Sequence, residues 1–195
     1  MSAIFQLSPE QGRILLEEAR RALKEKFEGR SAGVDPDETV PVCDPCLQAC
    51  SGIFVTLKIS GCLRGCIGSL VGKEALIQGA RTYALHAAFD DPRFRPLTQN
   101  ELDKVSIEVS VLTPAKTLVY EDADDLLAKL RPHVDGVTIR KGYCSATFLP
   151  QVWEQVPSPE EFLSNLCLKA GLSSDAWRTG SLEIETYQVQ YFEED

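Results

Sequence analysis

Residues 105–111 alternate strictly between apolar and polar side chains, and this pattern constrains the fold more than any other stretch of the chain. Because successive side chains of a strand point to opposite faces of a sheet, one face of this strand is buried and the other is polar. Half-polar strands are typical of antiparallel sheets, since strands of a parallel sheet are usually apolar on both faces. The apolar positions are Val105, Ile107, Val109 and Val111, and the polar ones are Ser106, Glu108 and Ser110.

Apolar residues at helical spacing predict four helices in the rest of the chain. Ser8 and Ser158 each begin a sequence of the capping-box type with a proline at the first helical position, and Gly29 and Gly171 are suitable C-terminal stops. The proline that follows Asp91 ends the helix before it. The predicted helices cover residues 9–28, 73–89, 124–131 and 158–171.

Further strands are predicted at 53–59, in a hairpin formed by 137–140 and 146–149, and at 182–192. The alternation in the last strand changes phase near Thr186, which predicts a β-bulge or bend there. Residues 30–50 show no clear period and are expected to form a loop or a chain crossing. Strands and helices separated by unequal connections predict an α+β fold with a largely antiparallel sheet flanked by helices.

The composition excludes several classes of protein. With 195 residues the chain suits one domain, or two small lobes that share a core. Its 29 acidic and 20 basic residues give a net charge of −9, which argues against a nucleic-acid binder. No apolar run approaches the roughly 18 residues that span a bilayer. Seven cysteines, an odd number, and an N-terminus without a secretory signal predict free thiols in a reducing cytoplasm.

The segment from Gly61 to Gly68 is the most unusual part of the sequence. Gly65 lies directly before Cys66 and Gly68 two residues after it, so the backbone there can approach a ligand closely. Arg64 would favour the thiolate of Cys66 if it lay beside the sulfur, and main-chain N–H groups from Gly65 to Gly68 would form an anion pocket. The alternative is a buried thiol in a tight turn between a strand and a helix, which is the commoner role for a free cysteine.

This segment resembles the signature hexapeptide of the AMMECR family, which is named for the AMME-syndrome candidate region. The resemblance continues in order along essentially the whole chain, and the run around Trp153 is especially similar to the bacterial and archaeal members called AmmeMemoRadiSam system protein A. The segments that carry it are 63–68, 53–57, 88–94, 96–98, 107–114, 135–137, 147–153 and 169–172.

The resemblance implies a single AMMECR-type domain over residues 1–195, with a larger and a smaller lobe and a cleft between them. It implies a Memo-type protein and a radical S-adenosylmethionine enzyme as partners, but no particular reaction and no particular cofactor. Matched residue by residue, the family motifs make Cys66, Arg64 and Glu108 the candidate catalytic residues. The candidate ligand-binding residues are Gly65, Gly68, Asp91 and Arg93. For Asp91 and Arg93, a loop-fixing ion pair is an equally good interpretation, and for Glu108 a solvated strand face.

Three functional hypotheses follow. The first is an enzyme or binding protein with a cysteine-centred cleft site for a small anionic molecule. The second is a non-catalytic adaptor for a Memo-type partner, which predicts a contiguous exposed apolar patch. The third is a metal-handling protein in which Cys43, Cys46 and Cys50 hold zinc or iron with Cys62 or Cys144 as a fourth ligand.

Two further sequence features refine these hypotheses. The spacing of Cys62 and Cys66 is that of a radical S-adenosylmethionine motif, but Ser69 stands where the third cysteine belongs, so this chain is not expected to be the radical enzyme. His86 on the helix 73–89 is either a base directed at Cys66 or, more commonly for such a position, a surface histidine.

Overall fold

The computed structural model describes residues 6–29, 44–179 and 181–194. The chain forms two compact units. The first consists of residues up to Leu112 together with those from Gln190 onward, and the second runs from Thr113 to Val189. Each unit has its own sheet and its own hydrophobic core.

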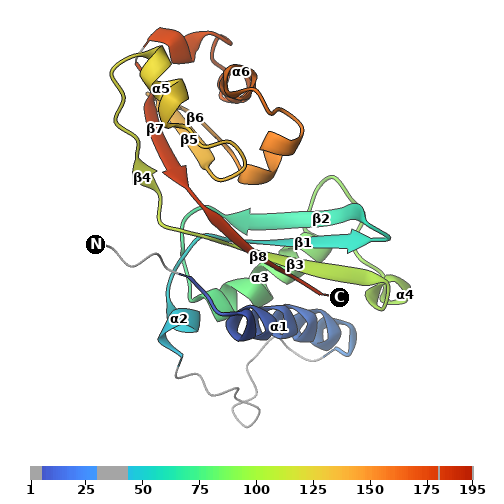
Figure 1. The fold of residues 1–195 in the computed structure, drawn as a ribbon. Coiled ribbons are helices and arrows are strands. Elements are labelled where there is room, and N and C mark those ends of the chain that lie inside the picture. Colours follow the sequence, from blue (N-terminus) through green and yellow to red (C-terminus); the bar gives the residue numbers. More distant parts are fainter. Residues whose placement is uncertain (1–5, 30–43, 180, 195) are drawn as a thin grey trace. The chain divides into compact units, whose positions relative to one another are not determined.

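The first unit packs helices against one face of a four-stranded sheet with the strand order β2-β1-β3-β8 (Figure 1). Its helices are α1 (Pro9–Phe27), α2 (Pro45–Gln48), α3 (Leu76–Phe89) and α4 (Gln99–Leu102). Its strands are β1 (Ile53–Ile59), β2 (Cys62–Ser69), β3 (Val105–Leu112) and β8 (Val189–Glu193). Helix α1 begins where Ser8 and Gln11 cap each other's main-chain N–H groups, as the capping box predicts.

The core of the first unit lies between this sheet and the helices α1 and α3. Val55, Leu57, Ile107 and Val109 are fully buried there, at every second position of their strands. Consequently the side chains between them point to the opposite face of the sheet. This opposite face, called the polar face below, carries residues Thr56 and Lys58 of β1, Cys66 of β2 and Glu108 of β3.

The second unit has a sheet with the order β4-β7-β5-β6. Its strands are β4 (Lys116–Thr117), β5 (Gly136–Lys141), β6 (Cys144–Phe148) and β7 (Glu183–Tyr187). Its helices are α5 (Ala123–Lys129), η1 (Pro150–Glu154), α6 (Pro159–Lys169) and η2 (Ala176–Thr179). The ring of Trp153 stacks on Phe162 with centroids 3.6 Å apart, and its indole N–H donates to the carbonyl of Asp135 at 2.7 Å. The buried indole therefore has both an apolar and a polar partner.

The predicted α+β class with antiparallel pairing is confirmed, and the strands are divided between two antiparallel sheets rather than gathered in one. Of the β-bulge or bend predicted near Thr186, the bulge is wrong, because Thr186 pairs in regular register with Lys116 and Val137. The chain leaves one sheet and enters the other at Gln188, between β7 and β8.

The alternative interpretation of the cysteine-containing hexapeptide, a tight turn between a strand and a helix, is also wrong. Residues 63–68 lie within β2, which forms an antiparallel hairpin with β1. The two positive-φ residues Ser60 and Gly61 form the turn instead. None of the described helices is both long and apolar enough to cross a membrane.

Candidate functional site

Cys66, Thr56 and Glu108 form one row across three strands on the polar face. In the sheet register, Thr56 of β1 lies opposite Cys66 of β2 on one side and opposite Glu108 of β3 on the other. Side chains at directly opposite positions of an antiparallel pair are neighbours on the same face. The sheet therefore brings two of the predicted catalytic residues into line, with a threonine between them.

The thiol of Cys66 has a hydrogen-bond donor beside it. The hydroxyl of Thr56 donates to Cys66 Sγ over 3.3 Å, and the Cys66 side chain is half-buried. A thiol is a weak acceptor, whereas a hydrogen bond to an ionised acceptor is about twice as strong as one between neutral groups. This contact consequently strengthens when the sulfur carries a negative charge.

Asp91 and Arg93 hydrogen-bond to the main chain of Cys66 at the outer edge of β2. Asp91 Oδ2 accepts the N–H of Cys66 at 2.9 Å, and the Arg93 guanidinium donates to the Cys66 carbonyl at 3.3 Å. The two side chains also pair with each other, at 2.7 and 2.9 Å. The N–H of Cys66 thus has an acceptor and its carbonyl has a donor, as they would if another strand were paired with β2 at this edge.

The charges of this pair are unequally exposed. The Asp91 side chain is only 1% exposed, and that of Arg93 is 55% exposed. The hydrogen bond from Arg93 lowers the pKa of Asp91 well below its usual range, and the N–H of Cys66 acts in the same direction. The pKa of Arg93 is raised, mainly by its hydrogen bond to Asp91 and in smaller part by the negative charge of an ionised Cys66. Arg93 is thus a cation held close to Cys66, through the hydrogen bond to its main-chain carbonyl.

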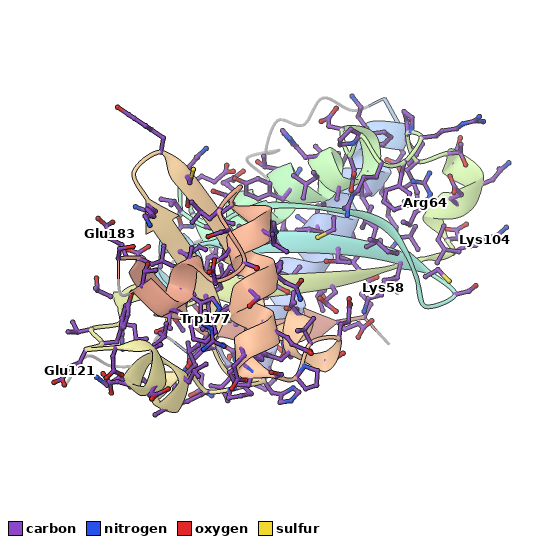
Figure 2. The ribbon with its side chains drawn as sticks, turned by 90° about the horizontal axis from the view of Figure 1, so that it is seen from above. Lys58, Arg64, Lys104, Glu121, Trp177 and Glu183 are labelled. Carbon is purple, nitrogen blue, oxygen red and sulfur yellow. The ribbon has the colours of Figure 1, made fainter. Side chains whose placement is uncertain are left out.

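Arg64 has a different role from the one expected of it. The register skips one residue between the pairs Leu57–Gly65 and Lys58–Leu63, which leaves Arg64 unpaired in a β-bulge. Its guanidinium binds both carboxylate oxygens of Glu101, at 2.9 and 3.1 Å, and Figure 2 shows it beside α4, the helix that carries Glu101. Arg64 lowers the pKa of Glu101 to about 2. Arg64 is therefore ion-paired with α4 through Nε and Nη2, whereas its buried Nη1 has no hydrogen-bond partner among the described residues.

Glu108 belongs to a second cluster on the polar face. Lys58 donates to Glu108 and to Glu193 of β8, each at 2.9 Å. The shared contacts raise the pKa of Lys58, with Glu193 as the largest cause. Two strand spacings separate Glu108 from Cys66 along the row, or about 10 Å. Glu108 can therefore act on the far end of a ligand but not directly on the thiol.

The two glycines of the hexapeptide serve close packing. A Cβ on Gly65 would lie 2.1 Å from the carbonyl oxygen of Ala87 in α3, and one on Gly68 would meet Phe54 at 2.4 Å. The main-chain N–H of Cys66, between them, is occupied by Asp91. The expected pocket of free N–H groups is therefore not formed at Cys66, since this part of the chain is an extended strand.

The remaining sequence candidates lie elsewhere. Cys43 lies outside the described residues, Cys46 is half-buried in α2 and Cys50 is exposed. Within the described ranges no three Cys, His, Asp or Glu side chains are grouped so that they could hold a metal ion. His86 is exposed on α3, where it lies 3.7 Å from Asp90, instead of facing Cys66.

Sequence reasoning missed Thr56 and Lys58 as members of the site. Both were assigned only to a strand, because their importance arises from which residues lie opposite them. The alternation within 53–59 and within 105–111 indicates which side chains of each strand share a face. Neither pattern specifies the register between the two strands, and so neither predicts which residues lie opposite each other.

The fold and the site define a mixed α/β protein with two antiparallel sheets and a hydrogen-bonded cysteine on the polar face of the first. The sequence model of the AMMECR1 family matches residues 16–192. The chain belongs to the AMMECR1 family.

Relatives match the chain over nearly its whole length. A protein of Thermofilum pendens is 39% identical and covers 96% of this chain and 92% of its own length. One of Methanothermobacter thermautotrophicus is 38% identical, covering 97% of each. The crystal structure of the uncharacterized protein PH0010 from Pyrococcus horikoshii matches with a TM-score of 0.83 at 33% identity, over 97% of this chain and 94% of that one. The family model thus spans both compact units.

Proposed function

We propose that the polar face of the first sheet is a small-molecule site centred on Cys66, whose thiol acts as a nucleophile. The observation that carries the proposal is the hydrogen bond from Thr56 to Cys66 Sγ. A nucleophilic cysteine reacts as the thiolate, and groups that stabilise its negative charge make it reactive at neutral pH. Thr56 supplies a donor, and Arg93 supplies a nearby positive charge.

Each candidate residue has a defined part in this proposal. Arg93 is the exposed cation that meets the negative group of an anionic ligand. Glu108 holds or releases a proton at the opposite end of the ligand, about 10 Å along the row. Asp91 positions the main chain of Cys66 and the guanidinium of Arg93. Arg64 and Gly65 support the packing of β2 and do not touch the ligand.

The proposal is tested by alkylating the folded protein with iodoacetamide over a range of pH and measuring each cysteine separately by peptide mass spectrometry. Cys62 is the internal control, because it lies on the same strand and is exposed. We expect Cys66 to react faster than Cys62 at pH 7 although it is less exposed. The two rates should become similar in urea, and Cys66→Ser identifies the reacting peptide.

A Cys66 that reacts more slowly than Cys62 at every pH in the folded protein contradicts the nucleophile. Its thiol would then be a packing element of the hairpin. Because both cysteines are measured in one sample, differences in reagent concentration or protein stability between preparations do not affect the comparison.

The adaptor function stays a prediction. In the first unit, Leu63 is 45% exposed at the start of β2, whereas Leu70 and Val71 are 38% and 66% exposed beyond its end. At about 3.3 Å per residue these positions are some 20 Å apart along the strand. A docked Memo-type partner would have to cover both ends of β2.

Memo-type and radical S-adenosylmethionine partners, and a cytoplasmic location, likewise stay predictions from the family resemblance and the cysteine count. We propose in addition that the two units work as one domain. The support for this is that the family model spans both of them without interruption.

A further inference from the structure

We propose that a groove between α1 and the end of β8 binds a small organic anion through Arg21 and Lys24. The groove has a volume of about 530 Å³, within the range of roughly 300–1,000 Å³ typical of small-molecule sites. Helix α1 contributes four basic side chains to its lining, which are Arg13, Arg20, Arg21 and Lys24. The proposal does not depend on Cys66.

The carboxylates that line the groove are already paired with cations. Glu17 binds Arg13. Glu194 binds Arg20 and also accepts the main-chain N–H of Ile107. Glu193 binds Lys58, which lies outside the groove lining. These acidic groups consequently repel an incoming anion less than three free carboxylates would.

The four cations differ in how much of their hydrogen-bonding capacity is used. Arg20 binds both oxygens of Glu194 and the main-chain carbonyls of Leu102 and Val105, so it serves as a structural tie. Arg21 contacts Glu18 through Nη1 alone, at 3.2 Å. Over the described ranges, Nε and Nη2 of Arg21 and the ammonium group of Lys24 have no hydrogen-bond partner.

Arg21 and Lys24 are three residues apart and hence neighbours on one face of the helix. A guanidinium presents parallel donors that match a carboxylate or phosphate, and an ammonium adds a second point charge. Leu16 supplies apolar surface in the same groove. These groups together suit an organic molecule with a carboxylate or phosphate and a small apolar part.

The two walls of the groove are held at a fixed spacing. The ring of Phe192 on β8 lies against Gly12 of α1, where an added Cβ would be only 1.9 Å from the ring. Near the other end of β8, the side-chain amide of Gln190 bonds both the N–H and the carbonyl of Leu7, at 2.9 and 2.6 Å. Contacts within the fold itself thus hold the two walls together, so a ligand need not order them.

The test is a titration of ¹⁵N-labelled full-length protein with citrate and, separately, with inorganic phosphate at constant ionic strength, followed by amide chemical shifts. We expect saturable shifts on the 13–24 face of α1 and at residues 193–194 with at least one of the two anions. Saturation with citrate alone indicates carboxylate ligands, and saturation with phosphate indicates phosphorylated ones.

The variant Arg21→Gln/Lys24→Gln should weaken the apparent affinity at least tenfold. Lys26→Gln is the matched control, because Lys26 lies on α1 over the ring of Phe89 at 6.0 Å and does not line the groove. It should retain the affinity within twofold. Shifts that stay linear with both anions, or equal losses in the double variant and the control, overturn the proposal.

Discussion

The carboxylate of Asp91 accepts the main-chain N–H of Cys66 at 2.9 Å, so a residue beyond the end of α3 determines where the thiol is held. Arg93 completes the contact by donating to the carbonyl of the same cysteine. Substitution of this pair should therefore alter both the stability of the first unit and the reactivity of Cys66.

Asp91→Asn should lower the free energy of unfolding by about 1–2 kcal/mol at pH 7, since it removes the charge of a buried carboxylate whose cationic partner Arg93 is 55% exposed to solvent. The pKa of Asp91 is lowered in the folded protein, so its charge stabilises the fold above the unfolded value of about 3.9. That stabilisation is lost as the pH falls below this value. Urea unfolding at pH 7 and pH 3 should show a smaller difference between the variant and the wild type at pH 3. An equal difference at both pH values contradicts the ion-pair explanation.

Thr56→Val should slow the alkylation of Cys66 about fivefold relative to Cys62, because it removes a hydrogen bond worth about 1 kcal/mol to the sulfur. Thr56→Ser keeps the hydroxyl and should preserve most of the rate. The measurement is the ratio of the two alkylation rates at pH 7. Slowing in Thr56→Ser but not in Thr56→Val would show that the methyl packing of Thr56 matters rather than its hydroxyl.

Comparing Arg64→Gln with Arg93→Gln should show that Arg64 contributes to stability, whereas Arg93 contributes to the reactivity of Cys66. Arg64→Gln breaks the contact with Glu101, whose pKa is about 2, and should cost roughly 1–3 kcal/mol of stability at pH 7. This loss should shrink as the pH falls from about 4.3 towards 2, where Glu101 of the folded protein is protonated. The ratio of Cys66 to Cys62 alkylation should stay unchanged in Arg64→Gln and fall severalfold in Arg93→Gln. A ratio that falls in Arg64→Gln and stays unchanged in Arg93→Gln would show that Arg64, and not Arg93, acts on Cys66.

Gly65→Ala should destabilise the protein by about 2–4 kcal/mol, because the added Cβ would overlap the carbonyl of Ala87. Gly61→Ala is the matched control. It meets nothing within 4 Å, and its positive φ of 76° carries only the usual penalty of about 1 kcal/mol for a side chain. Urea unfolding of the two variants distinguishes the effects. Similar losses in both would show that β2 can move away from α3.

The elements with strong local signals were predictable. The capping boxes at Ser8 and Ser158 place the starts of α1 and α6, and the alternation around Glu108 places β3 and its core face. The nature of β2 was not predictable in the same way, because the glycines of its hexapeptide suggest a turn in isolation. They are required by Ala87 and Phe54, which approach from elsewhere in the chain.

The sequence predicted which residues belong to the candidate site better than it predicted the contacts that they make. Cys66, Asp91 and Arg93 do come together, but Arg64 turns away to Glu101 and Thr56 takes a place beside the sulfur. The Thr56 contact depends on the strand register, and the Arg64 contact depends on a one-residue bulge. Such relations link residues that are distant in sequence, and hydrophobic periodicity does not specify them.

The neighbouring positions of β3 and β8 have a consequence for how such a chain could arise. The chain leaves the first unit after Leu112 and re-enters it at Gln190, in the strand that adjoins β3. The exit and the return are tied by main-chain and side-chain hydrogen bonds of 2.9 Å between Thr113 and Gln188. A gene for the first unit alone would need only a hairpin turn between these strands, and an ancestral sequence could have gained the second unit by insertion there without rerouting any other strand.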